Sequence, residues 1–428
     1  MRETSFLEQS EGSDVSERTE AAMLLQVQNL TSNETLSRAT SAPASEAARL
    51  RVLHVVSRLG LGGTEHGVLK VMNGLGEDKF EHRICAVRGI DSEFADRMNV
   101  AGKAYAVGDP RPGFQFPLFR LARVMREFRP HIVHSRNFGA LEAIPAARLA
   151  GVPVAIHSEH GYELEILSGL PLRRRLLCRA FFAMADAVFA VTRDLRTYHS
   201  RQSWLSAERF RVIYNGVNSA RFFPQPEKTE RIRRELDIPA GRVVVGSVGR
   251  LVPIKDHGTL LHAAEILVRR GKEIHVLIVG AGPELANLQA HVSGSSGLQG
   301  RVTFCGASDC VPDLLNAMDL FVLPSICEGM SNTLLEAMAT GLPGVVTRSG
   351  GNPELTKDGQ TGWLFAPRDV QALARHLTRL VDDPALRRKF GVAARERAIE
   401  QFDLAGMMRH YRELYFELVS RRGVSEGQ

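Results

Sequence analysis

The chain has 428 residues, a length that excludes a lone small binding module. With 44% of its residues hydrophobic and 24% charged, its composition excludes a wholly disordered or fibrous protein. Its 54 Lys and Arg residues outnumber its 48 Asp and Glu residues, and because the first 48 residues carry a net charge of −5, the rest carries +11. A body this basic indicates an anionic partner: a phosphate-bearing ligand, a membrane surface or nucleic acid.

Residues 1–48 are rich in Ser, Thr, Glu and Ala and hold few large apolar side chains. Such a segment buries too little surface to offset the entropy of ordering, so we expect a flexible N-terminal extension. The chain has no uncharged apolar run near the roughly 20 residues that cross a bilayer, and its first residues lack the basic stretch and apolar block of a secretory signal. Five scattered cysteines, an odd number, fit a reducing compartment. We therefore expect a cytoplasmic protein.

The ordered part begins with a short apolar run at residues 51–57, which ends in a glycine-rich turn and leads into a helical pattern at 68–75. A strand, a glycine turn and a helix in this order are typical of an α/β protein. The alternation continues with predicted strands at 81–87, 131–135 and 152–157 and predicted helices at 119–128 and 141–150. Strands that alternate with helices predict a parallel sheet.

A second series of the same kind follows the loop at 214–218. Its predicted strands lie at 243–248, 274–279, 302–305, 320–323 and 344–347, and its predicted helices at 256–270 and 333–340. The fold class is therefore expected to be α/β, with two doubly wound Rossmann-like domains. The expected boundaries are an extension at 1–48, a first domain at 49–217, a second domain at 218–402 and a C-terminal helix at 403–428. Because ligands of such sheets bind beyond the carboxyl ends of the strands, we expect the active site in a cleft between the two domains.

Two glutamates eight positions apart, Glu328 and Glu336, flank the start of a predicted helix. Ser331, Asn332 and Thr333 place free backbone N–H groups at the positive end of that helix, where a diphosphate would bind. Glu336, about one turn further along, would then reach the sugar hydroxyls of a nucleotide. The alternative is an ordinary helix cap followed by a solvated glutamate.

Arg250 and Lys255 stand at the turn after the predicted strand at 243–248, and lysine is rare in this arginine-rich chain. Both residues are placed to neutralise phosphate, and the alternative is a pair of exposed surface cations. The glycine turns at 280–283 and 350–354 offer further close backbone approach at the same sheet edge.

Two other interpretations of the motifs are weaker. The turn with Gly60, Gly62 and Glu65 is similar to a dinucleotide fingerprint, but its third glycine is absent and no acidic residue ends the second strand. Two HxxH pairs, at 131–134 and 157–160, have no partnering carboxylate motif, so we expect no metal site there.

Taken together, these motifs resemble the family-4 retaining glycosyltransferases of the GT-B fold. The resemblance runs from about residue 51 to the C-terminus and is strongest at 245–365. That stretch holds the GRL…K turn, GAGPE, an E-x7-E element inside PSICEGMSNTLLEAMATGLP, then GGNPE and TGWLF. One departure is Gly344, where a β-branched residue is more usual, and it bears on local packing rather than on chemistry.

The resemblance implies a role for each candidate residue. The implied catalytic residues are His160 over the donor sugar, Glu328 in contact with that sugar, and Arg250 and Lys255 on its diphosphate. The implied donor-binding residues are Gly63 beside the β-phosphate and acceptor, Arg250, Lys255, Gly280, Gly282, Ser331, Asn332, Thr333, and Glu336 on the ribose hydroxyls.

The resemblance also implies a reaction: metal-independent transfer of a hexosyl unit, with retention, from a nucleotide-diphosphate sugar to a saccharide or lipid-linked acceptor. No cofactor is expected, and no Asp-x-Asp pair is present to hold a metal ion. The first domain would face the acceptor, the second would bind the nucleotide sugar, and the C-terminal helix would pack back on the first domain. The pathway that the resemblance implies is exopolysaccharide synthesis of the exosortase-associated type. The alternatives are a nucleotide-sugar epimerase and a catalytically silent nucleotide-sugar-binding protein.

Residues 170–184 combine four arginines, Arg173, Arg174, Arg175 and Arg179, with an apolar stripe. As a helix, the segment would present a basic edge and an apolar face to an anionic membrane surface, which would place the protein on the inner face of the cytoplasmic membrane. The alternative is a helix packed on the core with solvated arginines. Nucleic acid is not expected, because the chain shows no recognised binding module.

Overall fold

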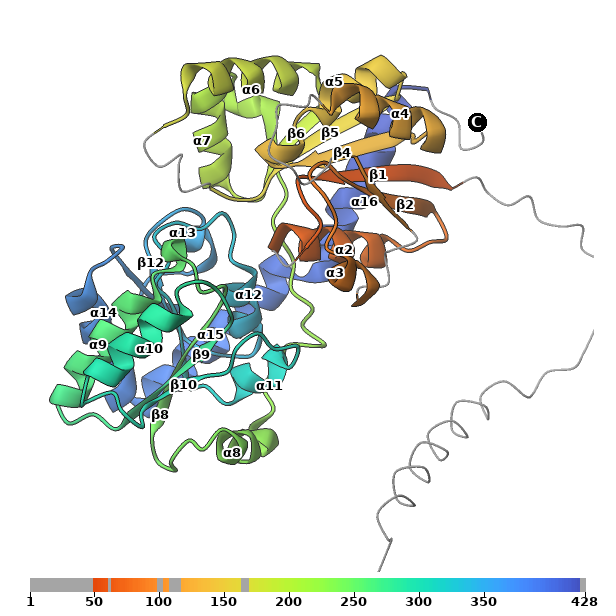
Figure 1. Cartoon of the computed structure of the whole chain (residues 1–428). Helices are drawn as coiled ribbons and strands as arrows, with labels where there is room; N and C mark the ends of the chain where they lie inside the picture. The colour runs from red at the N-terminus through yellow and green to blue at the C-terminus, as the bar shows by residue number, and fades with distance from the viewer. Residues whose placement is uncertain (1–48, 61–62, 98–102, 108–116, 163–168, 424–428) are drawn as a thin grey trace, which may run out of the picture. The chain divides into compact units, whose positions relative to one another are not determined.

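Two parallel sheets form the framework of the chain (Figure 1). The computed structural model describes residues 49–60, 63–97, 103–107, 117–162 and 169–423, so the extension expected at 1–48 lies outside the described residues. The predicted class, α/β with two doubly wound sheets, is confirmed.

The first sheet has seven strands in the order β3-β2-β1-β4-β5-β6-β7, and every neighbouring pair is parallel. Its strands are β1 (Leu50–Val56), β2 (Phe80–Ala86), β3 (Ala104–Ala106), β4 (Ile132–Arg136), β5 (Val154–Glu159), β6 (Ala187–Ala190) and β7 (Phe210–Val212). Strand β5 extends two residues beyond the prediction, to Glu159, and this extension places Ser158 inside the sheet.

The second sheet has six strands in the order β10-β9-β8-β11-β12-β13, again all parallel. Its strands are β8 (Val243–Val248), β9 (Ile274–Val279), β10 (Val302–Phe304), β11 (Leu320–Leu323), β12 (Gly344–Thr347) and β13 (Gly362–Phe365). At Gly344 an added Cβ would lie 3.4 Å from Val346 and 3.5 Å from Leu334, which is ordinary contact, so the missing β-branched side chain leaves no distortion.

Helices connect the strands of both sheets. Those of the first sheet are α2 (Gly63–Leu75), α3 (Ser92–Arg97), α4 (Leu118–Phe128), α5 (Ala143–Ala150), α6 (Leu172–Met184) and α7 (Arg193–Ser203). Those of the second are α8 (Pro226–Glu235), α9 (His257–Arg269), α10 (Leu285–Gly294), α11 (Val311–Asn316), α12 (Asn332–Ala339), α13 (Asn352–Leu355), α14 (Val370–Asp382) and α15 (Pro384–Phe402).

The central strands of the second sheet are buried on both faces, which explains why β8, β9 and β11 are mostly apolar along their length. In β8, successive side chains point to opposite faces, so Val244 packs in one apolar cluster with residues of α12 and α15, while Val245 packs in another with residues of α9 and α14. A strand covered on both sides leaves its carboxyl end as the accessible edge, where the loops gather.

The last helix, α16 (Leu404–Arg421), packs on the first sheet. Its residues Tyr411 and Tyr415 are fully buried in one cluster with Val52 and Ile132 of the central strands. Within the described residues, no helix is long and apolar enough to cross a bilayer.

Candidate active site

Two glycine turns stack on each other beyond the carboxyl ends of β8 and β9. The amide of Leu251 donates to the carbonyl of Ala281 at 2.9 Å, and the amide of Glu284 donates back to the carbonyl of Leu251 at 3.0 Å. A Cβ at Gly280 would collide with the carbonyl of Gly249, and one at Gly282 would collide with the carbonyl of Leu251. Glycine is therefore required at both positions by the close approach of the protein's own backbone.

Lys255 and Glu328 meet at this edge as an ion pair. Lys255 ends a short 3₁₀ turn (Pro253–Lys255), and Glu328 lies in the loop after β11. The hydroxyl of Ser325 donates to the same carboxylate oxygen, Oε1 of Glu328, at 2.6 Å. The pair is largely shielded, with side chains 20% and 10% exposed, whereas Arg250 on the same turn is exposed. The structure thus brings together Lys255 and Glu328, which the sequence had placed on separate motifs.

The loop that carries Glu328 also touches the loop that carries His160. A Cβ at Gly329 would collide with the carbonyl oxygen of His160 and would lie 2.7 Å from Cα of Gly161. A third loop closes on the second, because the amide of Gly351 donates to the carbonyl of Glu328 at 2.9 Å. These contacts bring His160, from the first sheet, beside the candidate residues of the second.

The helix that follows, α12, starts at the cap residue Ser331, whose hydroxyl accepts from the amide of Leu334 at 3.2 Å. The hydroxyl of Thr333 lies 3.2 Å from the same oxygen. This cap satisfies one amide of the first turn, and it leaves the amides of Asn332 and Thr333 without an intrahelical acceptor, as is general for the start of a helix.

Glu336, in the middle of α12, is paired with a lysine that the sequence did not indicate. Lys70 of α2 lies 3.9 Å from Oε1 of Glu336. Burial raises the pKa of Glu336, and the charges of Lys70 and Arg221 only partly oppose this shift. Burial likewise lowers the pKa of Lys70, although Glu336 acts in the other direction. No local motif could have revealed the pairing, because the two residues come from helices that connect strands of different sheets and are far apart in the chain.

His160 is held by a chain of hydrogen bonds that runs through the first sheet. Its Nε2 lies 2.8 Å from the hydroxyl of Ser158, which lies 2.9 Å from Nε2 of His134. Nδ1 of His134 in turn lies 2.8 Å from the hydroxyl of Tyr415 on α16. The C-terminal helix is thereby linked to the candidate catalytic histidine.

A buried cation adjoins this chain. Arg136, 1% exposed, lies 3.1 Å from Nδ1 of His54 and acts electrostatically on the neighbouring histidines. Burial lowers the pKa of His160 to about 3, and the positive charge of Arg136 contributes to that shift. His160 is therefore a neutral imidazole at neutral pH, able to form hydrogen bonds but not to act as a cationic acid.

The remaining candidates have simpler surroundings. Gly63 is the first residue of α2, and residues 61–62 of the glycine-rich turn predicted before it lie outside the described residues. Glu159, buried beside His160, lies 3.1 Å from Nε2 of His157 and 3.7 Å from Nε2 of His199. Burial would raise the pKa of Glu159, but these two histidines outweigh it and the pKa is lowered. The histidines at 157–160 thus contact hydroxyl and carboxylate groups of the protein.

Two arginines of α6 form hydrogen bonds within the protein, unlike the solvent-facing basic edge that the sequence predicted. Arg175 and Arg179 donate to backbone carbonyls at the end of α7, namely those of Gln202 at 2.8 Å and Trp204 at 2.6 Å. On the predicted apolar face, Phe182 is fully buried. The exposed apolar residues of the helix are Leu172, Leu176 and Met184, so of the predicted apolar face Leu176 is exposed whereas Phe182 is buried.

Comparison with known proteins identifies the family. The profile described as "Glycosyltransferase Family 4" matches residues 61–221, and the profile described as "Glycosyl transferases group 1" matches residues 228–397. A protein of Mycolicibacterium smegmatis, named GDP-mannose-dependent alpha-(1-6)-phosphatidylinositol monomannoside mannosyltransferase, is 32% identical over 294 residues, which are 66% of this chain and 76% of that protein. The chain belongs to the family-4 glycosyltransferases. It is therefore a retaining glycosyltransferase with a nucleotide-sugar donor, as the motifs predicted.

Two further relatives cover nearly the whole chain. The Escherichia coli protein named UDP-Gal:alpha-D-GlcNAc-diphosphoundecaprenol alpha-1,3-galactosyltransferase is 26% identical over 387 residues, 88% of this chain and 99% of that protein. The crystal structure of HepE from Anabaena in complex with UDP-glucose has a TM-score of 0.74 at 20% identity and covers 86% of this chain and all of that one. The latter likeness shows the GT-B fold.

Proposed function

We propose that this glycosyltransferase moves a hexosyl unit from a nucleotide-diphosphate sugar to a lipid-linked or saccharide acceptor in exopolysaccharide synthesis. The names of two relatives support a lipid-linked acceptor, since the E. coli protein is named for a diphosphoundecaprenol acceptor and the mycobacterial one for a phosphatidylinositol mannoside. The name EpsF of a Bacillus subtilis relative, 28% identical over 315 residues, is consistent with a role in polysaccharide synthesis. The exosortase-associated pathway is supported only by the motifs at 245–365.

The observation that carries the proposal is the ion pair between Lys255 and Glu328 at the stacked glycine turns. During transfer the sugar becomes positively charged at its anomeric carbon, and negative charge collects on the departing diphosphate. Arg250, Lys255 and the first amides of α12 are placed to stabilise that charge. When the donor binds, Lys255 leaves its ion pair with Glu328 and binds phosphate. The carboxylate of Glu328 is then free to accept a hydrogen bond from a hydroxyl of the donor sugar.

The other candidates complete the site. Glu336 binds the ribose hydroxyls of the nucleotide. A hydrogen bond from a hydroxyl would stabilise the charged carboxylate and so oppose the burial that raises the pKa of Glu336. His160, neutral and held by Ser158, forms a hydrogen bond to the donor sugar. Gly63, at the start of α2, approaches the β-phosphate and the acceptor.

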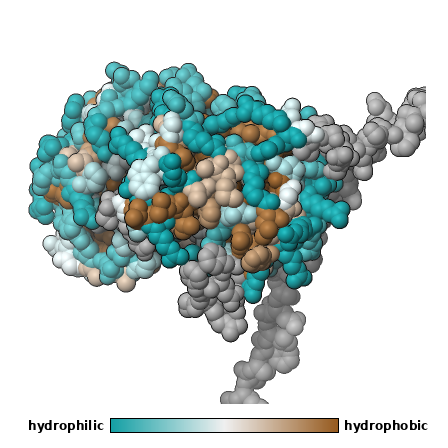
Figure 2. Space-filling view, turned by 90° about the horizontal axis from the view of Figure 1, so that it is seen from above, coloured by the Kyte–Doolittle hydropathy of each residue, from teal (hydrophilic) through white to brown (hydrophobic). Residues whose placement is uncertain are grey.

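We further propose that the enzyme meets its acceptor at an anionic membrane surface through α6. Leu172 and Leu176, one helical turn apart, are 64% and 52% exposed, and Arg173 lies beside them. Figure 2 shows apolar residues among hydrophilic ones on the side that carries α4, α5 and α6. Flotation with anionic vesicles tests this contact: changing both leucines to Ser should release the protein, and flotation equal to that of the wild type would contradict it.

The activity itself is tested with a panel of UDP- and GDP-hexoses and a GlcNAc-diphospholipid acceptor. We expect one donor to give a transfer product without any added divalent metal ion, with an α-linkage by NMR from an α-configured donor. Interconversion of donors without acceptor would indicate an epimerase, and donor binding without turnover would indicate a silent binding protein. Either result would overturn the proposal.

A further inference from the structure

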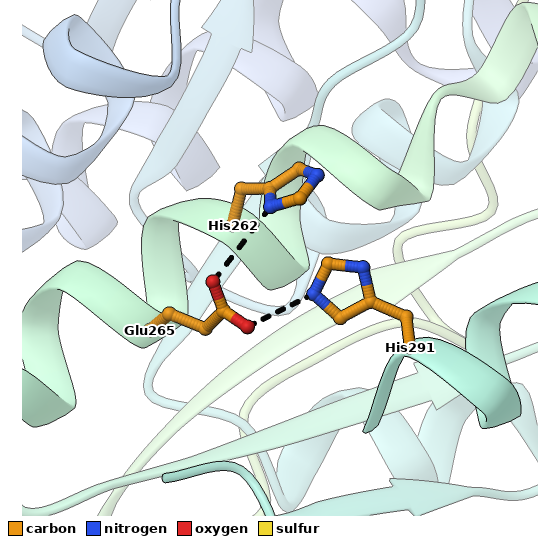
Figure 3. Close-up of side chains that lie close together, drawn as sticks. All are labelled: His262, Glu265 and His291. Atoms are coloured by element: carbon orange, nitrogen blue, oxygen red, sulfur yellow. Dashed lines mark hydrogen bonds and ion pairs between the residues drawn. The ribbon is translucent and has the colours of Figure 1, made fainter. Parts of the chain in front are cut away.

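A cluster of two histidines and one glutamate lies on α9 and α10 (Figure 3), two helices that contain none of the candidate donor residues. Nδ1 of His262 is 3.7 Å from Oε2 of Glu265, and Nε2 of His291 is 3.1 Å from Oε1 of the same carboxylate. The two imidazole rings meet edge to face, with centroids 4.4 Å apart. Among the described residues, this is the only group of three or more His, Cys, Asp or Glu side chains whose ligand atoms all lie within 4.8 Å of one another.

We propose that His262, Glu265 and His291 bind a zinc ion. Two imidazole nitrogens and one carboxylate oxygen, with water in the fourth position, form a common ligand set for Zn²⁺. Mg²⁺ and Ca²⁺ instead prefer six or more oxygen ligands, which this cluster does not offer. The three residues come from two different helices, so the metal would join α9 to α10.

The distances are compatible with closure around such an ion. Metal–ligand bonds of about 2.0–2.1 Å in a tetrahedral site place ligand atoms roughly 3.4 Å apart. The contact between His291 and Glu265 is already at 3.1 Å, so the movement required falls on His262. That side chain is 54% exposed and lies at the surface, where its ring can turn by the small amount needed.

The site is also accessible from solvent. Glu265 and His291, 19% and 22% exposed, line a surface hollow of about 450 Å³ together with Ser295 and Ser296. One charge opposes a cation: Nη1 of Arg269 lies 3.9 Å from Oε2 of Glu265. The arginine side chain is 68% exposed, so water and salt weaken its effect.

The alternative is that Glu265 merely forms an ion pair with a protonated histidine and so pins α10 to α9. That interpretation accounts for His291, but it gives no reason for a second imidazole turned towards the same carboxylate with its ring against the first (Figure 3).

The proposed ion would reinforce the donor edge without taking part in the reaction. Helix α9 begins two residues after Lys255, and α10 begins directly after the turn that holds Gly280 and Gly282. A metal between the bodies of these two helices would restrain both stacked turns. The sequence did not reveal this site, because His291 is 26 residues from Glu265 and only the packing of α10 on α9 brings them together.

The test is zinc binding by the full chain without a histidine tag, measured by competition with a chromophoric chelator and by melting temperature. We expect wild type to bind one Zn²⁺ more than His262→Gln or His291→Gln, and to gain melting temperature with Zn²⁺ but not with Mg²⁺. The matched control is His410→Gln, which removes an exposed histidine of α16 and should bind as wild type does. Arg269→Gln should bind Zn²⁺ more tightly, because it removes the opposing charge.

Two results would overturn the proposal: equal zinc stoichiometry in wild type and both histidine variants, or a loss in His410→Gln as large as in them. Should His291→Gln fail to fold because α10 detaches, His262→Gln still decides the matter, since its exposed ring contributes little to packing. A zinc-dependent gain in melting temperature that persists in His262→Gln would likewise contradict the three-residue site. Since binding is measured without donor or acceptor, this outcome is independent of the proposed transferase reaction.

Discussion

Lys255 and Arg250 are both assigned to the donor diphosphate, yet their surroundings predict different costs of removal. Lys255→Ala leaves Glu328 shielded and without its cation. Breaking a buried ion pair by removing one partner costs about 3–5 kcal/mol. The residual exposure of the pair, 20% and 10%, and the remaining hydrogen bond from Ser325 reduce this loss. We therefore expect Lys255→Ala to lower the free energy of unfolding by about 2 kcal/mol, which corresponds to roughly 4–8 °C in melting temperature for a domain of about 150–250 residues.

Arg250→Ala, by contrast, removes an exposed side chain. Its stability should stay within about 0.5 kcal/mol of wild type. Both variants should lose at least about 100-fold in kcat/KM, close to 2.7 kcal/mol of transition-state stabilisation. Arg250→Ala thus separates the effect on catalysis from the effect on folding.

A double-mutant cycle tests the reasoning about stability. Glu328→Gln alone should cost about 1 kcal/mol, since it removes the charge but keeps the shape of the side chain. Combined with Lys255→Ala it should cost clearly less than the sum of the two, with a coupling energy of about 1–2 kcal/mol. Chemical and thermal unfolding of the four proteins give this value. Additive losses within about 0.5 kcal/mol would refute a stabilising ion pair, and near-normal activity of both Lys255→Ala and Arg250→Ala would refute the diphosphate assignment.

Three further outcomes follow from the site. Glu336→Gln should raise the KM for the donor about tenfold with little change in kcat, because the ribose contact that we propose for Glu336 would be made equally in ground and transition states; an unchanged KM would contradict this role. Tyr415→Phe should lower kcat several-fold at constant donor KM by loosening His134 and, through it, His160, whereas loss of stability alone would leave kcat per folded molecule unchanged. The free energy of unfolding should fall as the pH drops below about 6.5, because burial lowers the pKa of His82 to about 4 and of His160 to about 3, so that only the unfolded chain takes up these protons. Each histidine contributes up to about 1.4 kcal/mol per pH unit. A urea midpoint that stays constant between pH 7.5 and 5.5 would contradict the burial of these histidines.

The fold and the polar motifs of the second sheet could be predicted because both depend on short-range patterns. Alternating strands and helices indicate a parallel sheet, and a strand followed by a glycine turn with Lys255, or by a loop with Glu328, indicates the binding edge. What the sequence could not give is the partner of each group. Lys70 meets Glu336 only because α2 and α12 come together, and no pattern within either helix records that meeting.

The hydrogen bonds of Glu354 are a second example of partners that the sequence does not predict. Its carboxylate accepts from the amides of Arg193 and Asp194, at 3.0 and 2.8 Å, and from the hydroxyl of Tyr214 at 2.9 Å. The motif GGNPE indicated a glycine turn for ligand approach, but this glutamate caps the start of α7, 160 residues earlier in the chain. A carboxylate at a helix N-terminus is favourable by itself, so the residue type fits a structural contact as well as a ligand contact.

The glycines of the motifs have a related explanation. In the sequence, these glycines suggest a backbone that is left open for phosphate to approach. In the structure, the protein's own backbone fills the space beside three of them. A Cβ at Gly282 would strike the carbonyl of Leu251, one at Gly329 the carbonyl of His160, and one at Gly350 the carbonyl of Glu328. Because main chain meets main chain at each of these points, the loops have little freedom to shift independently. The backbone of these loops is therefore held in place before any donor arrives, which would preorganise the site for the departing diphosphate that we propose it stabilises.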